Sequence, residues 1–199
     1  MGRAGSDPEA RQLMRELASR HPGLREALRA DAAMTALHRG ERHEFRSPGD
    51  AVLQMLRLAW VSDAFLALAL YRAKAALQRR GVPLLPRLLH KMAMRSAQVS
   101  IGDPVLVDPG VYVVHGQIVI DGLVEIGPGT VISPWVTIGL RAGDVRGPVV
   151  ERDVSIGTGA KLIGPVRVGA GARIGANAVV VDDVPAGATV VGAPARPAA

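Results

Sequence analysis

Through the second half of the chain, an aliphatic residue recurs at every sixth position. A period of six matches neither the 3.6-residue turn of an α-helix nor the two-residue alternation of a β-strand. It is typical of a parallel β-helix, in which each hexad forms a short strand and a corner and one residue per hexad points into a narrow interior. The series consists of Val150, Ile156, Leu162, Val168, Ile174, Val180 and Ala186. A second series of small apolar residues follows four positions behind it: Val154, Ala160, Val166, Ala172, Ala178, Val184 and Val190.

The same period continues upstream, with two interruptions. Its residues there are Ile101, Val107 and Val113, and then Ile120, Ile126, Ile132 and Ile138. The step from Val113 to Ile120 has seven residues, so one extra residue lies in the step that contains His115. Extra residues re-aim side chains in regular β structure and are often found beside active sites. The apolar pattern lapses from residue 140 to residue 149, which predicts that a charged, glycine-rich loop replaces two hexads. This loop is interpreted either as a functional loop or as a tolerated insertion.

Residues 1–96 read as a helical domain and residues 97–199 as the β-helix, so the predicted fold class is α+β. Asp7-Pro8 is a helix-start signal for a segment to about Ser19, and a second helix is predicted over 24–37. Ser47-Pro48 starts the longest predicted helix, which Gly81-Val82-Pro83 ends, and a short helix follows over 84–96. The long helix has an apolar stripe at Leu53, Leu56, Trp60, Ala64, Ala67 and Tyr71. We expect the helical domain to cap the open end of the first coil.

Composition narrows the function classes. The chain has no cysteine, and its net charge of +6 includes a basic run between residues 72 and 95 that contains no acid. This run favours a solvated helix face, with a phosphate-bearing small ligand as the alternative. Two tryptophans, two tyrosines and two phenylalanines are too few for base stacking, so nucleic acid is not an expected partner. No apolar stretch is long enough to span a bilayer and no signal peptide is visible, so we expect a cytoplasmic protein without a membrane partner.

Several motifs in their linear order resemble those of serine acetyltransferases, and the resemblance covers roughly residues 56–196. They are Leu70–Arg72, Gln98–Ile101, His115–Val119, Val136–Gly139, Arg146–Pro148, Ile156–Lys161 and Gly192–Arg196. The resemblance implies a left-handed β-helix and acetyl transfer from acetyl-CoA to a hydroxyl group. The flat apolar outer faces of such a prism are usually buried in trimers. We therefore expect a homotrimer with the active site between subunits; a hexamer is also possible.

His115 is the only histidine in residues 97–199. Acetyl transfer to an alcohol needs a base that titrates near neutral pH, and imidazole fits that need. The resemblance implies that His115 is this general base, whereas a surface histidine without a role is the alternative. Carbonic anhydrases of this fold use three histidines for zinc, so we expect no metal.

The sequence departs from the family pattern beside His115. The family has an aspartate fifteen residues before the histidine, which orients it, and here that position is Ser100. Asp103, Asp108 and Asp121 are candidates to replace it, and spacing does not choose among them. Ser100 and Asp121 are expected substrate-binding residues.

The acceptor side differs as well. Arg146 is retained, and the resemblance implies that its guanidinium holds the carboxylate of an amino-acid acceptor. Gly147 stands where the family has a second histidine, and Val114 stands where it has an aspartate. An acceptor ammonium would thereby lose a counter-charge.

On the donor side, small residues at the outer corners match positions that let coenzyme A approach the backbone. The expected donor-binding residues are Gly139, Thr158, Gly159, Gly175, Ala176 and Arg196. The solenoid's corners need small residues in any case.

Three hypotheses follow: a serine O-acetyltransferase, an O-acetyltransferase of another hydroxylated acceptor such as a sugar or specialised metabolite, and a non-catalytic trimeric scaffold. The chain ends at Pro197-Ala198-Ala199, without the flexible, isoleucine-ended tail through which serine acetyltransferases dock cysteine synthase. We therefore expect no cysteine synthase complex and weak control by cysteine.

Overall fold

The computed structural model describes residues 8–194 and 196–197. The predicted helix cap depends on Asp7, and the predictions about the tail depend on Ala198 and Ala199. These three residues lie outside the described range. The helices are α1 (Pro8–Arg20), α2 (Leu24–His38), α3 (Pro48–Val61), α4 (Asp63–Arg79) and α5 (Leu85–Ala97). The strands are β1 (Val99–Ile101), β2 (Leu106–Val107), β3 (Tyr112–Val113), β4 (Ile118–Ile120), β5 (Leu123–Ile126), β6 (Val131–Ile132), β7 (Thr137–Gly139), β8 (Arg146–Val150), β9 (Ser155–Ile156), β10 (Lys161–Ile163), β11 (Arg167–Val168), β12 (Arg173–Ile174), β13 (Val179–Val180), β14 (Thr189–Val191) and β15 (Arg196–Pro197).

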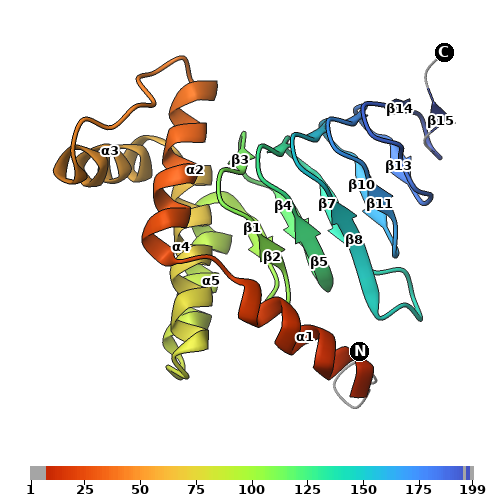
Figure 1. Cartoon of the computed structure of the whole chain (residues 1–199), viewed down its shortest axis with the longest axis horizontal. Coiled ribbons are helices and arrows are strands. Elements are labelled where there is room, and N and C mark those ends of the chain that lie inside the picture. The colour runs from red at the N-terminus through yellow and green to blue at the C-terminus, as the bar shows by residue number, and fades with distance from the viewer. Residues whose placement is uncertain (1–7, 195, 198–199) are drawn as a thin grey trace.

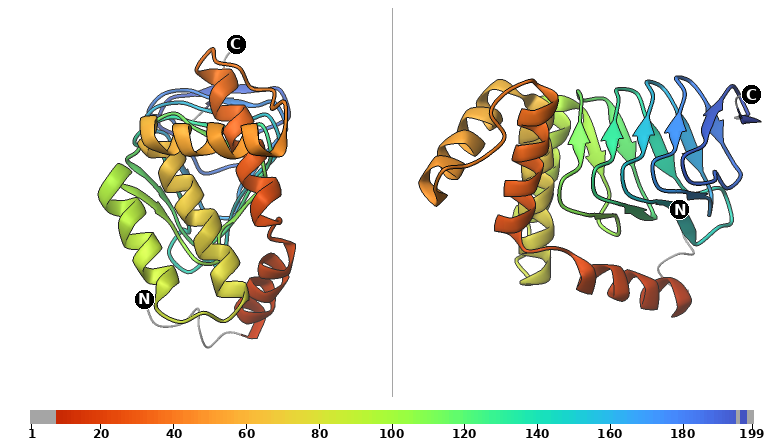
Figure 2. Two further views of the ribbon diagram at one scale, coloured as in Figure 1. Left: turned by 90° about the vertical axis from the view of Figure 1, so that its left-hand side faces the viewer. Right: turned by 45° about the horizontal axis from the view of Figure 1, so that its top comes forward.

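The strands form a parallel β-helix, as the period of six predicted. Successive strands pass in turn to three sheets: sheet A (β1-β4-β7-β10-β13), sheet B (β2-β5-β8-β11) and sheet C (β3-β6-β9-β12-β14-β15). All pairs are parallel except β14 with β15, which closes the last coil. The three sheets enclose a prism that is triangular in cross-section (Figure 2), with helices α2 to α5 gathered at its N-terminal end (Figure 1).

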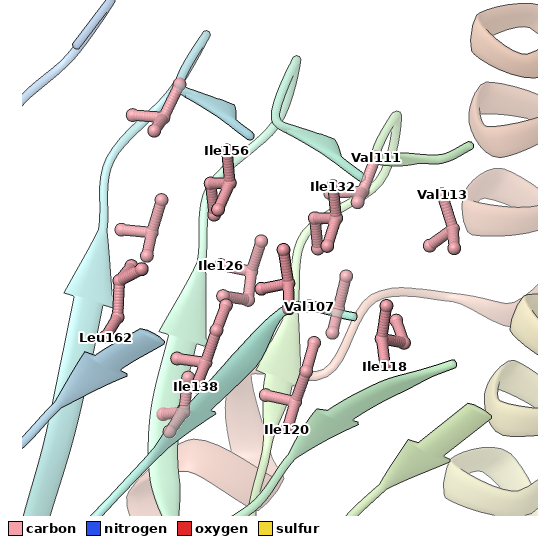
Figure 3. Packing of buried hydrophobic residues seen from close by; sticks show 14 of the residues in the cluster. Val107, Val111, Val113, Ile118, Ile120, Ile126, Ile132, Ile138, Ile156 and Leu162 are labelled. Carbon is pink, nitrogen blue, oxygen red and sulfur yellow. The ribbon is translucent and has the colours of Figure 1, made fainter. Parts of the chain in front are cut away.

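Both six-residue series are buried in the interior of the prism, so each hexad contributes two core residues rather than the predicted one. Figure 3 labels residues of the first series, among them Ile126, Ile138 and Leu162. Most members of the small second series come directly before a strand, as Val154 does before β9 and Ala160 before β10. Ala186 is an exception, because it is exposed and the first series ends at Val180. The last coil is shortened, and Val184 takes the next inward position by bridging to Val168.

The predicted loop is shorter than the sequence indicated. Strand β8 already begins at Arg146, so the loop covers only residues 140–145. Ile126 pairs with Val150, whereas Val150 pairs with Val168, so this coil is six residues longer than the next. The loop is therefore an insertion of one hexad and does not replace two. Its residues 141–143 are exposed.

Helices α2, α4 and α5 cover the first coil, which confirms the predicted cap (Figure 2). The Tyr71 hydroxyl donates to the Val105 carbonyl over 2.7 Å, and the Lys74 ammonium donates to the Ile101 carbonyl over 2.6 Å. The Arg72 guanidinium binds both carboxylate oxygens of Asp31 and donates to the Val107 and Asp108 carbonyls. Unpaired backbone acceptors of the coil are thus satisfied by side chains of α4.

These contacts correct the expectation of a solvated basic face. Arg72 and Lys74 are buried, at 4 % and 2 % exposure, and bind backbone carbonyls instead of solvent or a ligand. Burial also lowers the pKa of Lys74, which the nearby Asp103 carboxylate opposes. Two cations of the run are therefore structural.

The single long helix predicted from Ser47 to residue 80 is two helices. Ser62 caps α4 by accepting from the Phe65 amide over 3.3 Å, and α3 and α4 meet at a bend of 119°. The N-terminal part of the predicted stripe is consequently exposed, with Trp60 at 90 %. In the described residues no single helix has the length and apolar character of a membrane span, and only α3 and α4 taken together pass that test.

Helix α1 lies along sheet B (Figure 1), where Leu17 packs with Leu106 and Leu123. Arg20 pairs with Glu125 over 2.6 Å at the same contact. One outer face of the prism is therefore partly covered by the chain itself, which the sequence did not predict. Sheet A keeps an exposed apolar residue at Val119.

Candidate active site

The His115 step turns the chain from β3 into β4, and its extra residue is accommodated by unusual backbone geometry. Gln117 has a φ of 65°, and its amide donates to the Ala97 carbonyl over 2.8 Å. Gly116 passes so close to α5 that a Cβ atom would lie 1.6 Å from the Ala97 oxygen. The absence of a side chain at Gly116 thus lets the corner close against the helix and leaves His115 exposed.

A cavity of about 450 Å³ lies beside His115, between the solenoid corner and the helices. The α4 N-terminus contributes Ser62 and Asp63, and α5 contributes Arg95. Arg39, at the end of α2, lines it as well. The cavity therefore holds a candidate general base together with charges of both signs.

The corner of His115 continues along the molecule as one edge of the prism, which joins sheet C to sheet A. Backbone hydrogen bonds connect its coils: the Trp135 amide donates to the Gln117 carbonyl over 2.9 Å, and the Asn177 amide donates to the Thr158 carbonyl over 2.8 Å. The middle link is donated by the Gly159 amide to the Pro134 carbonyl over 2.9 Å.

Four predicted donor-binding residues lie on this edge: Thr158, Gly159, Gly175 and Ala176. They are two and three coils beyond His115, or about 10 and 14 Å at the usual spacing of neighbouring strands. Thr158 and Ala176 are exposed residues, and within the described part of the chain their backbone amides have no protein acceptor. The edge therefore fits an elongated ligand that accepts hydrogen bonds from backbone amides.

The other two predicted donor-binding residues lie elsewhere. Gly139 ends β7, at the opposite side of sheet A, where its carbonyl accepts from the Gly164 amide over 2.9 Å. Arg196 lies in β15, paired with Val191, and its side chain is outside the described part of the structure.

Ser100 and Asp121 do not meet His115 within one chain. Both line a separate cavity of about 380 Å³, together with His90 and Asp103. His115 precedes β4 and Asp121 follows it, so the strand separates them. Asp103 is paired with Lys74 over 3.0 Å.

Asp108, the third candidate for the missing acid, is not among the residues that line the His115 cavity. Burial raises the pKa of its carboxyl, and the charge of Arg20 opposes that shift. Within the described part of one chain, none of the three candidate acids lines the His115 cavity.

Arg146 lies at the start of β8 and lines a third cavity, of about 490 Å³, under α1. Its neighbours there include Glu16, Arg20 and Glu125. Gly147 is buried, and a Cβ atom on it would lie 2.7 Å from Val124 Cγ2, so the packing leaves no room for the family's second histidine.

Two residues that the sequence did not single out belong to this region. Asp63 lines the His115 cavity, and its only sequence signal is the Ser62-Asp63 pair that starts α4. Trp135 has a φ of 66° and is 56 % exposed, on the same edge as His115. A positive φ is unusual for a bulky residue, and such strain is concentrated at functional sites. In the part of the chain that is described, no group of three or more acidic or histidine residues fits a metal ion.

Comparisons with known proteins bear on the family and the fold of this chain. The family pattern "Bacterial transferase hexapeptide (six repeats)" matches residues 147–182. A serine acetyltransferase of Helicobacter pylori strain J99 is 37 % identical over 134 residues, which are 65 % of this chain and 78 % of the relative. The serine acetyltransferase of Synechococcus elongatus is 34 % identical over 135 residues, which are 66 % of this chain. The match spans only 55 % of that relative's length.

Solved structures show the same fold. Soybean serine acetyltransferase, in a structure complexed with serine, is 28 % identical and superposes with a TM-score of 0.72 over 95 % of this chain and 75 % of that one. The repeat pattern and the coiled sheets define an acyltransferase of the hexapeptide type. The extent and identity of the relatives go further: the chain belongs to the serine acetyltransferase family.

Proposed function

We propose that this protein transfers the acetyl group of acetyl-CoA to the hydroxyl of L-serine, with His115 as the general base. The observation that carries the proposal is the position of His115, between a charged cavity and an edge on which two backbone amides have no acceptor among the described residues. A donor and an acceptor bound on these two sides would meet at the imidazole.

The imidazole takes the proton of the serine hydroxyl as its oxygen attacks the thioester carbonyl. The carbon–oxygen bond forms, the carbon–sulfur bond breaks, and the proton passes from the imidazolium to the departing thiolate. Acetyl-CoA supplies the activated acetyl group. The amides of Thr158 and Ala176, with the small residues Gly159 and Gly175, are the groups of this chain that would hold the donor along the edge.

The first test is His115→Ala. Loss of a general base costs about 10²- to 10⁴-fold in turnover, and the exposed position of His115 predicts an unchanged melting temperature. Release of free thiol from acetyl-CoA in the presence of serine measures the rate. A folded variant with wild-type turnover would remove His115 from the mechanism.

We further propose a homotrimer whose active sites lie between subunits. Arg146, Ser100 and Asp121 lie away from the His115 cavity in one chain, and a rigid β-helix has no joint that would move them there. A neighbouring subunit is able to present its own copies of these residues to His115.

Mixed trimers test this assembly. His115→Ala and Arg146→Ala chains are unfolded together, refolded and assayed at low serine concentration. If each site takes His115 from one chain and Arg146 from the next, random cyclic mixing restores about one quarter of the sites. Activity no higher than the mean of the two parents would show that each subunit uses its own residues. A stable monomer in light scattering at micromolar concentration would reject the trimer itself.

A further inference from the structure

Asp63 is the one acidic residue among the described residues that line the His115 cavity. It is the first residue of α4, directly after the Ser62 cap, and its side chain is exposed. In the described part of the chain its carboxylate has no ion-pair partner, although arginines line the same cavity. An unpaired carboxylate beside a general base is available to a ligand.

The other charges of the cavity are positive. Arg39 already forms an ion pair, because its Nε atom donates to Glu41 Oε1 over 2.9 Å. Arg95, near the C-terminus of α5, makes no ion pair within the described residues. The cavity thus offers a free carboxylate, a free guanidinium and an imidazole. This set complements an ammonium, a carboxylate and a hydroxyl, the three functional groups of a β-hydroxy-α-amino acid, whereas a neutral sugar carries neither charge.

The apolar residue Val114 is the reason why the ammonium group of an amino acid would depend on the Asp63 carboxylate. It lines the same cavity directly before His115 and offers no charge to an ammonium group. Among the residues that one chain contributes to this cavity, Asp63 alone offers a negative charge to the ammonium group of an amino acid, whereas Arg39 and Arg95 are cations.

We propose that the Asp63 carboxylate binds the ammonium group of the amino-acid acceptor in this cavity. The proposal rests on the proposed acetyl transfer, and it adds the residue that makes the acceptor an amino acid. Asp63 acts in substrate binding and has no part in moving the proton.

The test compares Asp63→Asn with wild type on two acceptors, L-serine and 3-hydroxypropionate, which is serine without its amino group. Hydrogen bonds to charged groups contribute enough that their loss weakens binding by about ten- to hundredfold. We expect KM for serine to rise by about that factor in Asp63→Asn, with kcat nearly unchanged. The rate with 3-hydroxypropionate should stay the same or increase. Asp63→Glu should restore part of the affinity for serine.

Asp182→Asn is the matched control, because it removes an exposed carboxylate on the last coil and should change neither acceptor's kinetics. An unchanged KM for serine in Asp63→Asn would overturn the role of Asp63 while leaving the proposed function intact. An equal loss with both acceptors would also overturn it, since that pattern indicates a structural effect. A wild-type protein without turnover on serine would overturn both proposals.

Discussion

Replacing Arg72 by methionine should be among the most destabilising single changes in this chain. The Arg72 and Asp31 side chains are 3 % and 0 % exposed, and they join α4 to α2 over 2.8 Å. Methionine has a similar length but no charge and no donors. The variant would leave the Asp31 carboxylate buried with only the Gly110 and Val111 amides as donors, at 2.8 and 3.3 Å.

The magnitude follows from this burial. Removing one partner of a buried ion pair costs about 3–5 kcal/mol, because the other charge stays uncompensated. With a urea slope of about 2 kcal/mol per M, the midpoint of unfolding should fall by about 2 M. Burial already raises the pKa of Asp31, a shift that Arg72 opposes. In the variant the pKa should rise further, so the loss should be largest at neutral pH and shrink as the carboxyl becomes protonated in acid.

Urea unfolding followed by circular dichroism, at two protein concentrations, measures the effect. The control is Arg167→Met, which removes an exposed pair with Glu151 and should leave the midpoint of unfolding nearly unchanged, because solvent screens such a pair. The double variant Arg72→Met with Asp31→Asn should recover part of the stability, because it removes the buried charge. Equal costs for Arg72→Met and the control would refute this reasoning, as would a double variant less stable than Arg72→Met alone.

Two further stability predictions concern the His115 corner and the helices. Gly116→Ala would place a Cβ atom 1.6 Å from the Ala97 oxygen, so it should lower the free energy of unfolding by about 2 kcal/mol or more and also lower turnover. The control is Gly49→Ala, whose Cβ atom would have room and which should be neutral or stabilising. Equal melting temperatures of the two variants would contradict this prediction. Burial and the charge of Arg79 lower the pKa of His21 to about 4, below its ordinary 6.5, so the folded state disfavours the charged ring. Stability should therefore be complete above about pH 6.5 and fall as the pH drops towards 4, and His21→Gln should flatten that part of the pH profile in urea unfolding; parallel profiles would contradict it.

The β-helix was predictable because its core residues recur at a fixed spacing in the sequence. A residue that points inward must be apolar on every coil, so a period of six survives even where the strands are two residues long, as at Arg173–Ile174. The last coil escaped prediction because Val184 and Val190 belong to the second series by spacing but take the inward positions of the first. Pairing, not period, sets the register there.

The helical part was less predictable because apolar spacing does not report which partner a helix has. The stripe from Leu53 to Tyr71 keeps helical spacing across Ser62, yet the chain turns sharply at that residue. Ser62 is a typical cap, and this local signal was outweighed by the longer pattern. Burial of Arg72 was hidden for a similar reason, since its partner Asp31 lies on another helix.

The site was predictable where it depends on local sequence. His115 and the small residues of its edge are marked by the seven-residue step and by the repeat. Asp63 lies 52 positions before His115 and reaches the cavity only because α4 is packed on the first coil. Such a contact follows from the tertiary structure, and no sequence motif predicts it.

Helix α4 connects the cap of the β-helix to the proposed acceptor site. Tyr71, Arg72 and Lys74 in its middle bind carbonyls of the first coil, which fixes the helix on the end of the prism. The same attachment fixes its N-terminus, and with it Asp63, relative to His115 at the neighbouring corner. Each of these contacts joins a side chain of α4 to the backbone of the β-helix. The position of Asp63 therefore depends on the attachment of α4 to the first coil. The helical part is thus a component of the proposed acceptor site as well as a cover for the β-helix.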